Sequence, residues 1–318
     1  MPEPAEALIR VGAMGICGSD IHWWLEGAVG ETALTKPVVP GHELAGWVVG
    51  GPLDGHLVAV DPAIPCGHCA YCRAGHANLC PAVIFAGHGE QDGALRELMA
   101  WPAHRLTSLP DGFTAAAGAL LEPMGVALHA TDLAHLRPAD TVAVVGLGPI
   151  GLLAVQLVRA AGAGRVIGVD PLAHRRQAAI SLGADAVLAP AAVASAEARR
   201  DALAGADGAD RVFEIAGTDS AIAEALELAR PGARVMLAGI PDDDHSGFPA
   251  GLARRKGLTL VMVRRMKDMY PRCAALVQRG LVDLAPLVTG RFPLAQAPAA
   301  FDQAAARSGL KVIIEPQA

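Results

Sequence analysis

Short, almost wholly apolar segments alternate with longer segments of mixed polarity through the middle of the chain. Strands that are buried on both faces of a parallel sheet have this apolar character, and the segments between them are long enough for helices. The pattern therefore predicts an α/β domain with a doubly wound parallel sheet. The expected strands are residues 141–145, 165–169, 186–188, 211–215 and 234–238, and the expected helices are residues 149–161, 174–182, 193–203 and 220–229.

The first 122 residues differ, because glycine and proline separate short strand-like runs at residues 7–11, 47–49 and 57–60. This part is predicted to be a small, irregular, β-rich domain. Residues 115–129 are helical in composition, although Pro123 must kink or divide a helix there. Towards the C-terminus we expect a helix at residues 270–279, a Gly- and Pro-containing stretch at 281–293, a helix at 295–307 and a last strand at 311–314.

The composition narrows the class of protein. A chain of 318 residues, of which 52% are hydrophobic, suggests about two domains with sizeable cores. A net charge of -6 and a pI near 6.0 argue against nucleic acid as a partner. The chain lacks a run of about 18 apolar residues, and its acidic, proline-containing start lacks the features of a signal peptide. We therefore expect a cytoplasmic protein with no membrane partner.

Four of the six cysteines lie close together, at Cys66, Cys69, Cys72 and Cys80, with the spacing C-x2-C-x2-C-x7-C. Thiolates at this spacing can converge on one tetrahedral zinc ion in a closed structural site. A pair of disulfides is the alternative, but nothing in the sequence indicates secretion. The spacing therefore predicts a structural zinc site in a lobe at about residues 64–82.

Three glycines in the pattern G-x-G-x-x-G follow the first predicted strand of the parallel sheet and open the next helix. In this context the pattern predicts a dinucleotide site with the pyrophosphate at the helix N-terminus, while glycines that only form a packing turn are the alternative. Asp170 would accept hydrogen bonds from the ribose hydroxyls and repel a 2′-phosphate, which favours NAD over NADP. The nearby Arg175 and Arg176 weaken that preference. The expected cofactor contacts are Gly146, Gly148, Pro149, Ile150, Gly151, Asp170 and Arg175.

Other residues with metal-binding or acid–base chemistry are dispersed along the chain. They occur in the segments GICGSDIHWW, PGHELAG and ALLEPMGVALHA. A single cysteine or histidine more often fills a core than binds a metal, so none of these segments is specific by itself. The candidate residues are Cys17, Ser19, Asp20, His22, His42, Glu43 and Glu122.

Together and in this order, the segments resemble the zinc-dependent medium-chain alcohol dehydrogenases over nearly the whole chain. The resemblance rests on C-G-S-D-x-H, G-H-E-x-x-G, the cysteine cluster, the L-E-P helix and V-x-G-x-G-P-I-G. It implies a GroES-like catalytic domain at residues 1–122 and 264–318, into which a Rossmann domain at residues 123–263 is inserted. The polyol branch (sorbitol and L-iditol dehydrogenases) is most similar, because Glu122 stands where simple-alcohol enzymes have a cysteine ligand.

The resemblance also implies a catalytic zinc, and thus two zinc ions per chain. Its ligands would be Cys17, His42 and a carboxylate, either Glu43 or Glu122. The other carboxylate would reach the metal through water or by ligand exchange. Asp20 would orient His42.

In the implied mechanism a secondary alcohol gives hydride to the nicotinamide while zinc acts as a Lewis acid. Ser19 would take the hydroxyl proton and pass it towards His22 and solvent. A local turn hydrogen bond for Ser19 and an ordinary surface position for His22 are the alternatives. Trp23 and Phe85 match substrate-facing positions, and Arg265 matches a basic residue near cofactor and substrate, with packing in the core or the zinc lobe as the alternative for each.

Two differences from the family favour a specialised substrate. The chain begins at about the third strand of the usual catalytic domain, so we expect an N-terminally trimmed domain without the first hairpin. The segment GHELAGWVVGGPLDGHLVAVDP is also shorter than in the family, with Gly55-His56-Leu57 in place of Gly-Asp-Arg. Missing strands would expose a sheet edge or widen the substrate cleft, which favours a cyclitol, an amino alcohol or a biosynthetic intermediate.

The sequence therefore predicts NAD-dependent oxidation of a secondary alcohol in a polyol-like small molecule. One alternative is an NADPH-dependent ketone or aldehyde reductase of the same fold. Another is a non-catalytic dinucleotide-binding protein whose only zinc is structural. Relatives form dimers or tetramers, so the resemblance implies a homo-oligomer joined partly through the edge of the Rossmann sheet, where we place residues 234–240.

Overall fold

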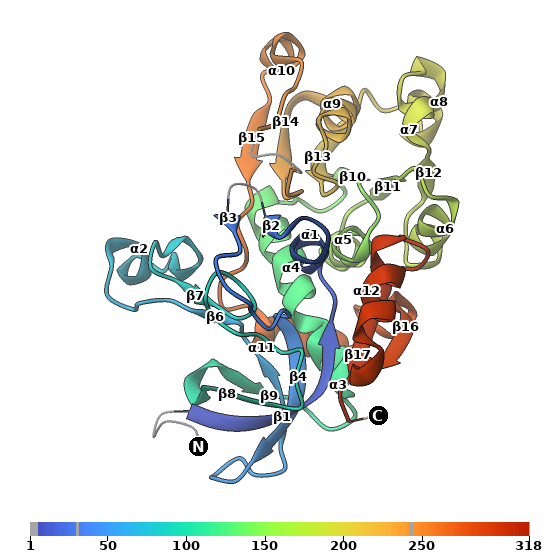
Figure 1. Ribbon diagram of the computed structural model, residues 1–318. Helices are drawn as coiled ribbons and strands as arrows, with labels where there is room; N and C mark the ends of the chain where they lie inside the picture. The colour runs from blue at the N-terminus through green and yellow to red at the C-terminus, as the bar shows by residue number, and fades with distance from the viewer. Residues whose placement is uncertain (1–5, 30–31, 242–244, 318) are drawn as a thin grey trace. The chain divides into compact units, whose positions relative to one another are not determined.

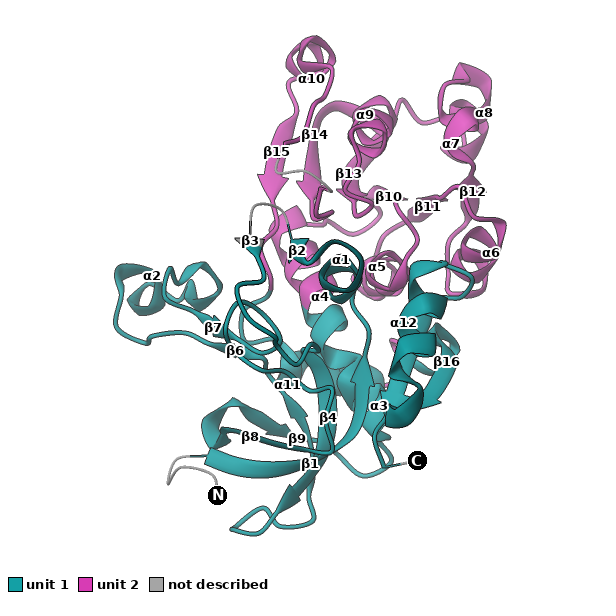
Figure 2. Ribbon diagram, viewed as in Figure 1, with its two compact units in different colours: residues 1–125, 266–278, 284–318 teal, residues 126–265, 279–283 magenta. Residues whose placement is uncertain are grey.

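The structure, a computed structural model, describes residues 6–29, 32–241 and 245–317. The chain forms two compact units (Figure 2). Unit 1 comprises residues 1–125, 266–278 and 284–318, and unit 2 comprises residues 126–265 and 279–283. Unit 1 is therefore built from both ends of the chain, and unit 2 mainly from its middle.

Unit 1 is built on a seven-stranded sheet in which β1 (Glu6–Gly15) is a central strand (Figure 1). The strand order is β16-β17-β1-β4-β5-β9, and β8 also pairs with β1. β4 (Glu43–Val49) runs antiparallel to β1 and places Glu43 opposite Gly15. The remaining strands of this sheet are β5 (Leu57–Val60), β8 (Leu98–Pro102), β9 (Leu106–Ser108), β16 (Val288–Pro293) and β17 (Lys311–Glu315).

The core of unit 1 follows from the alternation of side chains along these strands. Ile9 and Val11 of β1 belong to one buried cluster, and the register between β1 and β4 then shifts between Val11 and Ala13. This irregularity adds one residue, so Met14 and not Ala13 continues the same apolar cluster. The end of β1 is thereby fixed in both register and orientation, which matters because the candidate site begins there.

Short helices and two small sheets complete unit 1. The predicted helix at residues 115–129 is divided at Leu120, and Pro123 lies in the first turn of the second part, where proline is tolerated. The small sheets pair β2 (Ala28–Val29) with β3 (Thr32–Ala33) and β6 (Ala63–Ile64) with β7 (Ile84–Phe85). The helices of unit 1 are α1 (Gly18–Glu26), α2 (Ala70–Arg73), α3 (Ala115–Ala119), α11 (Tyr270–Gln278) and α12 (Ala297–Ala305), and α4 (Leu121–Ala134) begins in unit 1 and continues into unit 2 from residue 126.

Unit 2 contains a six-stranded parallel sheet with the order β12-β11-β10-β13-β14-β15. This confirms the predicted doubly wound α/β fold. The strands are β10 (Thr141–Val145), β11 (Arg165–Val169), β12 (Ala186–Leu188), β13 (Ala209–Glu214), β14 (Ala229–Leu237) and β15 (Thr259–Met262). The helices are α5 (Pro149–Ala160), α6 (Ala173–Ser181), α7 (Pro190–Val193), α8 (Ala196–Ala202), α9 (Asp219–Leu228) and α10 (Ala250–Lys256).

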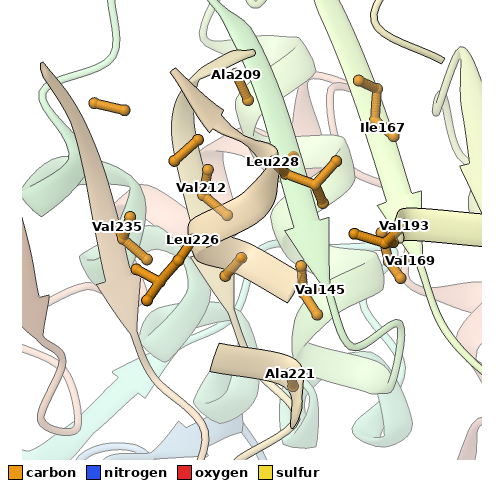
Figure 3. Close-up of a cluster of buried hydrophobic side chains, with 14 of the residues drawn as sticks. Val145, Ile167, Val169, Val193, Ala209, Val212, Ala221, Leu226, Leu228 and Val235 are labelled. Carbon is orange, nitrogen blue, oxygen red and sulfur yellow. The ribbon is translucent and has the colours of Figure 1, made fainter. Parts of the chain in front are cut away.

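Apolar side chains cover both faces of this sheet. Figure 3 shows one face, where Val145 and Val169 cluster with Val212 of β13 and Leu226 of α9. Because strand side chains alternate, Val144 faces the opposite side, and α5 contacts β10 and β11. Burial on both faces explains why these strands are apolar along their whole length.

The predicted edge strand is wrong. Residues 234–240 fall largely in β14, which pairs with β13 on one side and β15 on the other. β12 and β15 are the edge strands, and the sequence pattern does not reveal β15 because its four residues are only partly buried or exposed. The sequence also does not reveal α1, α10 or β16. None of the helices in the described ranges is long and apolar enough to cross a membrane.

Candidate active site

The pairing of β1 with β4 brings three potential metal ligands together. Cys17 follows the end of β1 and His42 precedes Glu43 at the start of β4, while Gly15 lies opposite Glu43. One ligand atom from each of Cys17, His42 and Glu43 lies within 4.8 Å of the others. A thiolate, an imidazole and a carboxylate are the donors that a catalytic zinc uses, with a further position left for substrate. This donor set fits zinc, and we call it the Cys17–His42–Glu43 set.

Gly15 is required for this arrangement. A Cβ atom at this position would lie 2.2 Å from Oε2 of Glu43, far inside van der Waals contact. The absence of a side chain allows the Glu43 carboxylate to lie directly against the backbone of β1. The glycine is therefore part of the site, although it offers no ligand atom.

Asp20 connects the two loops that carry the ligands. Its Oδ2 accepts a hydrogen bond from the backbone N of Cys17 (2.9 Å), and its Oδ1 accepts one from the backbone N of Gly41 (3.1 Å). Nδ1 of His42 lies 3.6 Å from the same Oδ1. Burial alone would raise the pKa of the Asp20 carboxyl, but His42 and the bond from Cys17 lower it below its usual value. Asp20 is thus an ionised, buried group that fixes both ligand loops.

Lys311, which the sequence analysis did not identify, holds Glu43. Its Nζ donates to Oε1 and Oε2 of Glu43 at 2.7 and 2.6 Å and to the carbonyl of Ile16 at 2.9 Å. Lys311 is 3% exposed and Glu43 is 1% exposed. Burial would lower the pKa of Lys311, but Glu43 and Cys17 outweigh this effect and raise it. The only sequence signal is a charged residue directly before the apolar run Val-Ile-Ile of β17.

Glu122 lies apart from the Cys17–His42–Glu43 set. It occupies the first turn of α4 and is buried, but it is not among the described residues whose ligand atoms converge with Cys17. Burial raises the pKa of Glu122 to about 7, with Glu43 adding to the rise while His42 and Lys311 oppose it. A carboxyl with such a pKa can gain or lose a proton near neutral pH.

Helix α1 carries the other predicted catalytic residues. Cys17 is the N-cap of α1, and Asp20 completes a reciprocal capping box with it. Ser19 is buried, and His22 is one helical turn further on, with its Nδ1 3.2 Å from Oε1 of Glu26. The spacing of three residues places Ser19 and His22 on the same side of the helix.

Two rings, those of Phe85 and His88, pack near His42. The ring of Phe85 lies 5.3 Å from that of His42, and the ring of His88 lies 5.1 Å from both. Trp23 contacts His88 edge-on at 5.6 Å. The predicted wall residues Trp23 and Phe85 thus both contact His88. Sequence reasoning did not identify His88, because a single histidine in GHGE has no specific spacing.

The four clustered cysteines also converge. Their sulfur atoms lie within 4.8 Å of one another, and no disulfide joins any of the described cysteines. Backbone N–H groups point at three of the sulfurs, from Cys66 to Cys80, from Cys69 to Cys66 and from Cys72 to Cys69, each at 3.4 Å. Hydrogen bonds from the backbone of His68 and Cys69 lower the pKa of Cys66 to about 6. This all-sulfur donor set fits a closed tetrahedral zinc site.

The glycine turn of unit 2 fits a dinucleotide. Gly146 has φ +94°, and a Cβ atom at Gly151 would lie 1.9 Å from the carbonyl oxygen of Gly146. Gly148 is the N-cap of α5, and Pro149 and Ile150 form its first positions. The turn therefore leaves the N–H groups of the helix start free of side chains, as pyrophosphate binding requires.

Asp170 lies beside this turn. Its Oδ2 accepts a hydrogen bond from the backbone N of Leu147 and its Oδ1 one from Leu172, both at 2.8 Å. Nη1 of Arg175 lies 4.0 Å from Oδ2 of Asp170, whereas Arg176 donates to the backbone carbonyl of Asp170. Arg265 also belongs to unit 2 and has φ +50°. The Cys17–His42–Glu43 set belongs to unit 1.

The fold, the Cys17–His42–Glu43 set, the four clustered cysteines and the glycine turn are together the features of a zinc-dependent dehydrogenase. The family model for zinc-binding dehydrogenases matches residues 149–279, and the model for the alcohol dehydrogenase GroES-like domain matches residues 3–111. The chain therefore belongs to the zinc-binding alcohol dehydrogenase family, as the sequence predicts. It is an oxidoreductase that uses zinc and a nicotinamide dinucleotide and acts on small-molecule alcohols.

Individual relatives agree with this assignment. The chain is 35% identical to "Probable D-xylulose reductase A" of Aspergillus clavatus, over 98% of this chain and 90% of that protein. It is 33% identical to sorbitol dehydrogenase of Bacillus subtilis, over the same shares. A solved structure from Sinorhizobium meliloti, described as a zinc-binding dehydrogenase bound to NADP, superposes with a TM-score of 0.90 at 31% identity, over 99% of this chain and 93% of that one.

Proposed function

We propose that this chain uses NAD to oxidise a secondary alcohol group in a polyol-like small molecule, such as a polyol, a cyclitol or an amino alcohol. The Cys17–His42–Glu43 set carries the proposal, because three protein ligands in a buried position leave room for a substrate hydroxyl. The polyol class is supported by the relatives named for D-xylulose and sorbitol.

In this proposal Cys17, His42 and Glu43 hold the catalytic zinc, and the four clustered cysteines hold a structural one. When bound, zinc would supply a Lewis acid that makes a secondary hydroxyl more acidic, and the nicotinamide would supply the hydride acceptor. Ser19 takes the hydroxyl proton and passes it to His22, which is half-buried and in reach of Glu26. Glu122, with its pKa of about 7, buffers protons and charge near Glu43.

The two units have separate tasks in this proposal. Unit 1 carries the chemistry, and unit 2, at residues 126–265 and 279–283, binds the dinucleotide through its glycine turn and Arg265. We also propose that copies of the chain associate as a dimer or tetramer through β15. Its support is that β15 is an edge of the sheet and that Met262 is 75% exposed there.

A substrate screen tests the proposed function. Xylitol, sorbitol, myo-inositol and 2-amino alcohols are offered with NAD, and the formation of NADH is followed by absorbance. We expect turnover with at least one neutral polyol, because this chain brings together both proposed sets of zinc ligands. If no secondary alcohol reacts and the protein holds one zinc per chain after purification without chelator, the non-catalytic alternative is favoured.

Cofactor preference gives a second prediction. We expect kcat/KM to be at least about tenfold higher with NAD than with NADP, because the Asp170 carboxylate repels a 2′-phosphate. Asp170→Ala should reduce this preference, since Arg175 then remains as the nearby charge. Asp185→Ala is the matched control, because this carboxylate directly precedes β12 of the same unit and pairs with Arg159. A wild-type preference for NADPH would contradict the proposal and favour the reductase alternative, which the NADP-bound relative supports.

A further inference from the structure

Only two carboxylates are buried among the described residues of unit 2, and both stand where a strand of the parallel sheet ends. Asp170 directly follows β11 and is 3% exposed, and Glu214 is the last residue of β13 and is 1% exposed. Asp170 holds the glycine turn through the backbone N of Leu147. The cofactor contacts proposed above include Asp170, but they do not include Glu214.

The side chain of Glu214 folds back onto the turn that follows β13. Its Oε1 accepts hydrogen bonds from the backbone N of Ala216 (2.8 Å) and from that of Gly217 (2.6 Å). Burial raises the pKa of the Glu214 carboxyl, while the N–H groups of Gly217 and Ala216 oppose the rise. A carboxyl oxygen can accept both bonds in either protonation state, so this one side chain holds the turn.

The turn at residues 215–217 lies between the turns that end the two neighbouring strands. β13 pairs with β10 on one side and with β14 on the other (Figure 1). A Cβ atom at Gly146, after β10, would lie 2.8 Å from the backbone N of Ala216. A Cβ atom at Gly217 would lie 2.2 Å from the carbonyl oxygen of Ile240, after β14. The backbones of the three turns are therefore in direct contact, and a shift of the middle one disturbs both others.

The 215–217 turn stands at the topological switch point of the sheet. The strand order β12-β11-β10-β13-β14-β15 reverses its direction between β10 and β13. In such sheets a dinucleotide lies across the carboxyl ends of the strands at this point, with one mononucleotide half on each side. Asp170 after β11 marks the adenosine side. The half that carries the nicotinamide therefore falls on the side of β13, where Glu214 holds the turn.

We propose that Glu214 is a positioning residue for the nicotinamide half of the cofactor, because it fixes the 215–217 turn through two backbone N–H groups. The inference rests on the proposed dinucleotide-binding role of unit 2 and adds a residue that acts through the backbone of its own turn. Loss of the carboxyl oxygens should weaken the binding of NADH. It should not weaken the binding of ADP, which lacks the nicotinamide half.

The test measures the dissociation constants of NADH and ADP by calorimetry in the zinc-loaded protein. For Glu214→Ala we expect NADH to bind about 10- to 100-fold more weakly, while the Kd of ADP changes less than about threefold. Glu214→Gln keeps an amide oxygen in place of Oε1, so its NADH affinity should stay within about threefold of the wild type. Asp170→Ala should weaken the binding of both ligands, because Asp170 lies on the adenosine side.

Two further variants separate positioning from a general loss of structure. Gly217→Ala displaces the same turn without removing the buried carboxyl, so it should also weaken NADH more than ADP. Glu227→Ala is the matched control and should change neither Kd. Glu227 is an exposed carboxylate in the last turn of α9, the helix that follows the same turn, and it pairs with Arg199 at 3.9 Å.

The outcomes distinguish this inference from the proposed function. Equal weakening of NADH and ADP in Glu214→Ala, or no weakening of either, would overturn the positioning role and leave the dehydrogenase proposal intact. A Glu214→Gln variant that binds NADH as weakly as Glu214→Ala would overturn it too, because the oxygen acceptor is still present. A wild-type protein that binds neither NADH nor ADP would overturn the proposed function and the positioning role with it.

Discussion

His42→Ala is expected to lower kcat/KM for the best alcohol substrate by at least about 10³-fold, because a metal Lewis acid contributes several kcal/mol and each 1.36 kcal/mol is a factor of ten. His42 supplies the only imidazole of the Cys17–His42–Glu43 set, and the remaining thiolate and carboxylate cannot enclose a zinc ion. The variant should therefore retain about one zinc per chain, bound by the four cysteines, where the wild type has about two. Metal analysis and steady-state kinetics on the same preparation measure both quantities.

We expect His42→Ala to reduce the catalytic activity without reducing the binding of NADH. NADH binding, followed by the enhancement of its fluorescence, should be retained in His42→Ala, because the glycine turn and Asp170 belong to unit 2. His56→Ala is the control, since this exposed histidine lies in the same unit but outside both metal-ligand sets. A variant that keeps two zinc ions, or one that keeps most of its activity, would show that His42 is not a ligand of a catalytic metal.

The sequence predicts the parallel sheet well for a physical reason. β10 and β11 begin and end where the predicted strands do, because strands buried on both faces contain almost no polar position. β12 is only partly buried, but its run Ala-Val-Leu is wholly apolar and is predicted too. Other partly exposed elements give a weaker signal. β15 has four residues with no buried position, and α1 opens with Gly18 after a cysteine N-cap, so neither gives a recognisable pattern. The misplaced sheet edge follows from the missed β15.

The residues of the candidate site also differ in whether the sequence predicts them. Cys17, His42 and Glu43 stand in short motifs and could be proposed from the sequence, although each motif is weak by itself. Lys311 and His88 could not, because their roles depend on contacts between distant parts of the chain. The pairing of β1 with β17, which places Gly15 opposite Ile313, brings Lys311 to Glu43 across 268 positions of sequence. No local sequence pattern predicts the contact between Lys311 and Glu43.

Lys311→Met is expected to lower the free energy of unfolding of unit 1 by about 3–5 kcal/mol in the zinc-free protein, because it leaves the buried Glu43 carboxylate without its partner. Urea unfolding measures this directly. Trp23, Trp24, Trp47 and Trp101 all belong to unit 1, so tryptophan fluorescence reports the unfolding of that unit alone.

Three comparisons test whether the loss comes from the buried pair. Lys36→Met should cost less than about 1 kcal/mol, because Lys36 and Glu90 form an exposed pair at 3.5 Å. In the double variant Lys311→Met/Glu43→Gln the total loss should be smaller than the sum of the single losses, since no unpaired charge remains. Zinc should also reduce the effect of Lys311→Met, because a bound cation replaces the lost positive charge beside Glu43. If Lys311→Met and Lys36→Met cost the same, Lys311 does not hold the carboxylate in solution.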